Sequence, residues 1–290
     1  MSGIALAIVL IAAFLHACWN FLAKKSHNKL VFIWWFLLIA AIAYLPMILY
    51  FWPSVLISMH GWSCILATGV IHALYFWLTA GAYERGDLSL VYPLSRGSGP
   101  LLVPILAVIL LNEKLSSPGV VGIVLVIFGI YSIHLQSFSM KSVLAPLRAV
   151  PQGASLWAFS TGFTIAGYSL VDKIGVQAVF PPVYIYLMFA ISLLLLSPVV
   201  VIRHAAAIKT EWHANKMSII INGILVLATY LMILFAFQIS KVSYVVAARE
   251  VSIVFSAIFG IVALREKNAG QKIIGSLLIT MGVVVIGFSK

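Results

Sequence analysis

The chain has 290 residues, of which 63% are hydrophobic and only 9% are charged, and its mean hydropathy is +1.13. This composition excludes a soluble globular protein. The formal net charge of +11 does not indicate binding to nucleic acid, because the cations lie at the ends of apolar runs rather than on one basic face.

Ten apolar runs follow one another along the chain, and each approaches the roughly 20 residues that a helix needs to cross the hydrocarbon core. Helical periodicity, and the need to satisfy every backbone polar group within lipid, favour a helical bundle over a β-barrel. We therefore predict an all-α integral membrane protein with ten transmembrane helices, over residues 3–23, 30–52, 62–83, 88–111, 117–136, 153–173, 181–202, 217–239, 243–264 and 269–288.

The first predicted helix carries His16 and Asn20 on one face, and Trp19 lies beside them. Polar side chains are costly inside lipid and ordinarily face the interior of the bundle. We predict that Trp19 and Asn20 contact a substrate. His16 is a candidate for proton coupling, since histidine changes charge near neutral pH; a hydrogen bond to a neighbouring helix is the alternative interpretation.

The third and fourth predicted helices contribute further candidates. His72 and Tyr75 lie in the third, and Tyr92 and Arg96 lie in the fourth, next to prolines that weaken its backbone. We predict Tyr75, Tyr92 and Arg96 as substrate-binding residues and His72 as a second candidate for proton coupling. The alternatives are packing for the aromatic residues and, for Arg96, an extended side chain that reaches the membrane interface.

In the second half of the chain, Tyr168 shares one helix face with Thr164 and Asp172, and Tyr230 lies in the eighth predicted helix. We predict Tyr168 and Tyr230 as substrate-binding residues. Aromatic rings near opposed charges suit a partly zwitterionic solute, because a ring can receive a cation and an arginine a carboxylate.

The ninth predicted helix carries Arg249 and Glu250 next to each other. We predict Arg249 as a substrate-binding residue, with the membrane interface as its alternative position. Glu250 is the carboxylate candidate for proton coupling, and a purely structural ion pair with Arg249 is the alternative.

The chain repeats one pattern about 153 residues apart. Ser89–Gly129 contains L-N-E-K and then two glycines seven apart, and Val242–Gly282 contains L-R-E-K and the same glycine pair. A duplicated unit with an odd number of spans must be inverted relative to its copy, which is typical of secondary transporters. We expect the glycines to permit close helix packing; they are Gly122, Gly129, Gly275 and Gly282.

Several motifs give the chain a family resemblance. They are W-N-x-x-x-K from Trp19, A-x-x-x-G-D-L-S-x-V-Y-P-L from Ala82 to Leu94, R-G-S-G-P-L-L-V-P from Arg96 to Pro104, and L-L-N-E-K. With the repeated glycines, this order resembles the drug/metabolite transporter superfamily, EamA branch, over essentially the whole chain. The resemblance implies two inverted five-helix repeats, residues 1–136 and 153–290, joined by a linker over 137–152.

The second copy departs from the first in its fourth helix, where Pro93, Pro100 and Pro104 are replaced by non-proline residues. We therefore expect the ninth helix to be straighter than the fourth.

The function that the resemblance implies is secondary-active or facilitated transport, as an exporter, of small polar metabolites such as amino acids across the cytoplasmic membrane. A lipid-linked-sugar flippase of the same superfamily is the alternative. An integral-membrane enzyme is disfavoured, because R-G-S-G lacks the first glycine of an intramembrane serine protease and no metal-ligand spacing occurs. We expect no catalytic residue, metal or cofactor. The expected partners are membrane lipid and the solute, with a monomer favoured over a dimer.

The lysines and arginines predict the orientation of the chain. Twelve fall at connections on one side of the predicted bundle and four on the other, with Arg96 and Arg249 counted as intramembrane. The richer side is cytoplasmic under the positive-inside rule, so both termini are expected outside.

Overall fold

The computed structural model of the chain describes residues 1–23, 26–52, 56–85, 88–133, 135, 153–264 and 269–289. No β-strand occurs within these ranges. In chain order the helices are α1 (Gly3–Ala23), α2 (Lys29–Ala43), α3 (Leu45–Phe51), α4 (Met59–Arg85), α5 (Leu88–Leu110), α6 (Ser117–Ile133), α8 (Gly153–Ala178), α9 (Pro181–Arg203), α10 (Ala205–Ile239), α11 (Val242–Arg249), α12 (Val251–Leu264) and α13 (Ala269–Phe288).

Most of these helices cover the predicted spans. In the described part of the chain, six stretches are long and apolar enough to cross a membrane, and the bent pair α2 and α3 makes a seventh candidate. Parts of α5 and α6 form shorter apolar helices, Leu94–Leu110 and Ser117–Ile133. The predicted linker over 137–152 lies outside the described residues.

The predicted helix over 30–52 is divided in the structure. α2 and α3 meet at Tyr44 with a bend of 46°, and Pro46 lies in the first turn of α3. Proline has a fixed φ and no N–H to donate, so it is well suited to the start of a helix and interrupts one that would continue through it.

The ninth predicted helix is divided too, at Glu250 between α11 and α12. The N–H of Glu250 donates to the carbonyl of Ala247 at 3.2 Å, and that of Ile253 donates to the carbonyl of Glu250 at 2.9 Å. These i to i−3 bonds form a tight turn of 3₁₀ type. The expectation that this helix is straighter than the fourth stays a prediction, since the stretch Val242–Phe259 continues across this turn as one apolar span. α5 continues through its prolines, whereas the second copy is interrupted where two adjacent charged residues, Arg249 and Glu250, are buried.

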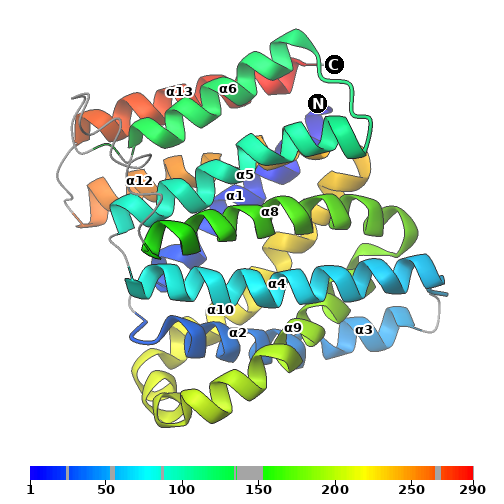
Figure 1. The fold of residues 1–290 in the computed structure, drawn as a ribbon, viewed down its shortest axis with the longest axis vertical. Coiled ribbons are helices and arrows are strands. Elements are labelled where there is room, and N and C mark those ends of the chain that lie inside the picture. Colours follow the sequence, from blue (N-terminus) through cyan, green and yellow to red (C-terminus); the bar gives the residue numbers. More distant parts are fainter. Residues whose placement is uncertain are drawn as a thin grey trace.

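α6 and α13 lie side by side at one edge of the bundle (Figure 1). A Cβ atom on Gly122 would lie 2.7 Å from the carbonyl oxygen of Gly282, and one on Gly275 would lie 2.6 Å from the carbonyl oxygen of Gly129. Backbones this close leave no room for a side chain. The four repeated glycines therefore meet in two pairs across one helix interface.

Both chain ends lie at the same end of the bundle (Figure 1). The Met1 amino group donates to the carbonyls of Ser289 and, at 3.4 Å, Ile286. Between the two ends of the bundle, α8 packs against α4 and α5, and α1 packs against α10 and α12. The buried core of the bundle lies among these helices.

Candidate functional site

Polar and charged side chains from several helices meet in the interior of the bundle. Arg96 from α5, Arg249 at the end of α11 and Glu250 after it are at most 7% exposed. Arg96 donates a hydrogen bond to Nε2 of His16 on α1. The two arginines are therefore buried inside the bundle rather than exposed on its surface.

Glu250 lies between the two arginines. Its Oε1 is 3.8 Å from Nη1 of Arg96 and 3.7 Å from Nε of Arg249. Because the first arginine belongs to the first half of the chain and the second to the second half, this acidic group joins the halves electrostatically. Removing one member of such a buried group leaves an uncompensated charge.

Several buried polar atoms of this region have no hydrogen-bond partner within the described residues. They are Nδ2 of Asn20, Nε and Nη2 of Arg249, Oε2 of Glu250, both side-chain polar atoms of Asn222, and Oγ1 of Thr229. Leaving a buried donor or acceptor unpaired costs about 1–3 kcal/mol, so such groups ordinarily have a partner. These atoms are suited to contact a polar solute or water.

Aromatic rings border this polar region. The ring of Trp19 lies 4.7 Å from that of His16. The ring of His72 stacks on Tyr168 with a centroid distance of 4.2 Å. Tyr75 meets Tyr168 edge-on, with a centroid distance of 5.5 Å. Arg249 interacts electrostatically with Tyr168, so the rings and charges form one continuous cluster.

A second polar centre surrounds Asp172 on α8, which is 0% exposed. Its Oδ1 accepts hydrogen bonds from Thr68 at 2.5 Å and from Tyr184 at 2.9 Å. Its Oδ2 accepts one from Tyr230 at 2.5 Å. Tyr230 also lies 5.4 Å from the ring of His72, so this centre adjoins the aromatic cluster.

The structure places most of the predicted site residues together. Six of the eight predicted substrate residues join the cluster through the contacts above: Trp19, Tyr75, Arg96, Tyr168, Tyr230 and Arg249. Asn20 lies one turn after His16 on α1. Tyr92 lies in α5, and its side chain is outside the described residues. The three predicted coupling residues, His16, His72 and Glu250, also lie in the cluster.

Asp172 was not among the predicted site residues, although its sequence signal was present. It is the single acidic residue of its predicted span and lies one turn from Tyr168. Its partners Thr68 and Tyr184 have no such signal, because they come from α4 and α9 and meet Asp172 only in the folded bundle.

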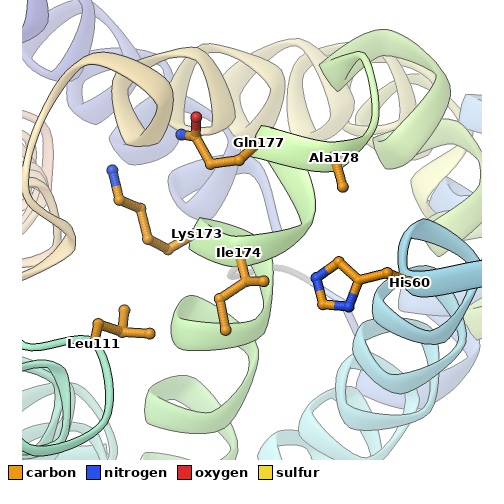
Figure 2. Close-up of a pocket in the computed structure, with 6 residues that line it drawn as sticks. All are labelled: His60, Leu111, Lys173, Ile174, Gln177 and Ala178. Carbon is orange, nitrogen blue, oxygen red and sulfur yellow. The ribbon is translucent and has the colours of Figure 1, made fainter. Parts of the chain in front are cut away.

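A cavity of about 360 Å³ lies apart from the cluster, where α4 begins and α5 and α8 end. Its lining residues are His60, Leu111, Lys173, Ile174, Gln177 and Ala178. Figure 2 shows Lys173 and His60 on opposite sides of it, with Ile174 between them. Lys173 donates to the carbonyls of Phe237 and, at 2.8 Å, Ser240, so it also caps the end of α10.

Comparison with known proteins gives a family match in both halves of the chain. A model of the EamA-like transporter family matches residues 1–135 and again residues 152–288. This chain belongs to the EamA-like transporter family. Together with its apolar helices, membership makes this EamA-like protein a multi-pass membrane protein of the transporter class.

One solved structure shows that the fold of this EamA-like protein recurs elsewhere. It is a crystal structure with TM-score 0.72 and 16% sequence identity, and the match covers 98% of this chain and 96% of that chain. No protein with a curated description matches the sequence.

Proposed function

We propose that this EamA-like protein is a secondary-active or facilitated transporter that exports small polar metabolites, such as amino acids, across the cytoplasmic membrane. The observation that carries this proposal is the interior cluster. It combines charges of both signs, aromatic rings and buried polar atoms that have no hydrogen-bond partner within the described residues. In a membrane protein, ionisable groups at such positions ordinarily serve a transport pathway.

The proposed architecture has ten transmembrane helices, with α2 and α3 forming one span and α11 and α12 another. The two inverted five-helix repeats are residues 1–136 and 153–290, joined by 137–152. Opposed charges and rings at their interface support this arrangement, since substrate sites of inverted-repeat transporters lie there. Both termini are outside in this proposal, and the protein works as a monomer.

In the proposed binding mode, two kinds of side chain contact different parts of the solute. Arg96 and Arg249 hold an anionic end, because a guanidinium presents a planar set of donors to a carboxylate. Tyr75, Tyr168 and Tyr230 receive a cationic or apolar part. Trp19, Asn20 and Tyr92 complete the proposed set.

The cluster favours a carrier of soluble solutes over a lipid-linked-sugar flippase. A flippase needs a groove that opens to lipid between helices, whereas Arg96, Tyr168 and Arg249 are at most 7% exposed. A closed polar site is suited to a solute that leaves water on one side and returns to water on the other.

The test is transport in vesicles that contain the purified protein. A panel of radiolabelled amino acids, amines and organic acids is assayed by counterflow, with and without a pH gradient, and empty vesicles are the control. We expect counterflow of at least one zwitterionic or anionic solute. Absence of counterflow for the whole panel, together with movement of a fluorescent polyprenyl-phosphate sugar between leaflets, would replace the carrier with the flippase.

A further inference from the structure

Asp172 is the point at which helices from both halves of the chain meet. It lies on α8, and its three hydrogen-bond donors come from α4, α9 and α10. All three donors are neutral hydroxyl groups. The carboxylate is completely buried, so bulk solvent does not reach it.

The charged and titratable groups around Asp172 can be assigned helix by helix. α4 contributes His72 and Cys64, α9 contributes Tyr184, α10 contributes Tyr230, α8 itself contributes Tyr168, and α11 contributes Arg249. On α5, Arg96 interacts electrostatically with Tyr168, which lies one helical turn before Asp172 on α8.

No lysine or arginine forms an ion pair with Asp172 in the described part of the chain. Arg249 interacts electrostatically with Asp172 without forming an ion pair with it, and its ion pair is with Glu250. Burial without an adjacent cation favours the neutral form of a carboxyl group, whereas hydrogen bonds from hydroxyls favour the charged form. Opposed effects of this kind are suited to a group that exchanges a proton.

We propose that Asp172 is the proton-binding site of this transporter, and that its protonation reverses the hydrogen bond with Tyr230 at the edge of the solute site. The proposal rests on the transport function proposed above. One proton enters from water and forms an O–H bond on Asp172. No other covalent bond breaks.

Protonation changes which groups can donate. An ionised carboxylate only accepts hydrogen bonds, whereas a protonated one has one O–H to donate. Because Oη of Tyr230 lies 2.5 Å from Oδ2 of Asp172, it is the acceptor for a new hydrogen on Oδ2. The hydroxyl hydrogen of Tyr230 must then turn away, toward the space bordered by Tyr168 and His72. The solute site thus gains a donor when Asp172 takes up a proton.

Protonation also changes the charge of the cluster. Arg96, Arg249, Glu250 and an ionised Asp172 carry two positive and two negative charges, which sum to zero. A proton on Asp172 leaves one positive charge in excess. Because like charges repel and opposite charges attract strongly away from water, the protonated state favours binding of one carboxylate at the arginines. The proton and the solute are then carried together, and export follows the outward gradient of the solute.

Two of the other candidates, His16 and Glu250, fit this role less well. Nε2 of His16 accepts a hydrogen bond from Arg96, so protonation there would place two cations in contact. Glu250 lies between two arginines, which favour its ionised form. A metal cation is disfavoured at Asp172, because each of the three hydroxyl oxygens lies only 2.5–2.9 Å from a carboxylate oxygen, which leaves no room for an ion between the two.

The closing experiment uses the proton itself as the probe, so it does not depend on a known solute. Purified full-length protein in lipid is followed by infrared difference spectroscopy as the pH falls from about 8 to about 5. An ordinary aspartate stays ionised over this pH interval, because its pKa is about 3.9. We expect a carbonyl stretch of a protonated carboxyl group to appear in the wild type and in Glu250→Gln, and to be absent in Asp172→Asn. Proton uptake on acidification should fall by about one proton per chain in Asp172→Asn.

Tyr230→Phe provides a second variant that keeps the carboxyl group. It removes the proposed acceptor, so the carbonyl stretch should move to higher wavenumber as its hydrogen bonding weakens. A band that persists in Asp172→Asn, or that disappears in Glu250→Gln, His16→Ala or His72→Ala instead, would overturn the assignment. An unchanged band position in Tyr230→Phe would overturn the reversal of the hydrogen bond. The spectra test proton binding at Asp172, and vesicle counterflow tests the transport function. Either measurement can contradict its own proposal while the other gives the expected result, so the two proposals are tested separately.

Discussion

Arg96 and Arg249 occupy corresponding positions of the two repeats, yet their surroundings differ. Both pair with Glu250, but Arg96 also donates to His16, whereas Nη2 of Arg249 has no hydrogen-bond partner within the described residues. A guanidinium with an unpaired N–H donor is better suited to receive a carboxylate from outside the protein. Arg249 is therefore the stronger candidate for direct solute contact.

We expect Arg249→Ala to reduce transport of a carboxylate-bearing solute by at least about tenfold, which corresponds to about 1.4 kcal/mol. Arg249→Lys should recover only part of the loss, because an ammonium lacks the planar pair of donors. Initial counterflow rates measure this effect, and Arg203→Ala, at an exposed position at the end of α9, is the matched control. Wild-type rates in both Arg249→Ala and Arg96→Ala would show that the arginines serve structure alone.

At the scale of helices, the interface between α6 and α13 depends on glycine. A Cβ atom on Gly129 would lie 2.7 Å from the carbonyl oxygen of Gly275, and one on Gly282 would lie 2.6 Å from that of Gly122. Backbone atoms cannot move aside as a flexible side chain can, so substitution must separate the helices.

We expect Gly122→Leu and Gly275→Leu to lower the folded yield, since overpacking a tight interface costs about 1–3 kcal/mol. Gly3→Leu is the control, because nothing lies within 4 Å of a Cβ atom at that position. Monodisperse protein after size-exclusion chromatography in detergent is the measurement. If Gly122→Leu matches Gly3→Leu in yield, the glycine pairs do not hold this interface.

The start of α11 is another helix-scale feature. Glu113, in the loop after α5, accepts hydrogen bonds from the N–H of Val242 at 2.6 Å and of Ser243 at 3.3 Å, and from the Ser243 hydroxyl at 2.6 Å. An anion at a helix N-terminus satisfies free N–H groups and opposes the positive end of the helix dipole. The corresponding Glu266 of the second repeat lies outside the described residues.

Glu113→Gln should lower the stability of the protein by about 1 kcal/mol, because it removes this charge and one of the two carboxylate acceptors. Thermal unfolding in detergent, followed by tryptophan fluorescence, measures the change. Glu84→Gln, which removes an exposed carboxylate paired with Arg85 at 3.8 Å, should have a smaller effect. Equal midpoints for the two variants would contradict the capping role.

At the scale of the whole molecule, the connections gather at two opposite ends of the bundle (Figure 1). The start of α4, which Leu56 precedes by three residues, lies at the end that holds the chain termini, and the end of α9, at Arg203, lies at the other. The excess of lysine and arginine on the Arg203 side predicts that this end faces the cytoplasm.

We expect a membrane-impermeant maleimide to label Leu56→Cys in intact cells and Arg203→Cys only after the membrane is opened. The background for both is Cys18→Ala with Cys64→Ala, since both natural cysteines are free thiols. Leu56 is fully exposed and Arg203 is also exposed, so accessibility does not limit the reaction. The opposite labelling pattern would invert the orientation, and labelling of both from one side would contradict the arrangement of the helices.

The sequence by itself determined where the apolar helices lie and which glycines and arginines correspond in the two halves. Those features depend on local composition and spacing, because lipid requires each spanning segment to be apolar and to satisfy its own backbone. Only the tertiary structure decided that Thr68 and Tyr184 donate to Asp172 and that the ninth span is interrupted at Glu250. The partners of a buried polar group come from helices far apart in the chain. Their identity depends on how the helices pack, which no periodicity within one segment can specify.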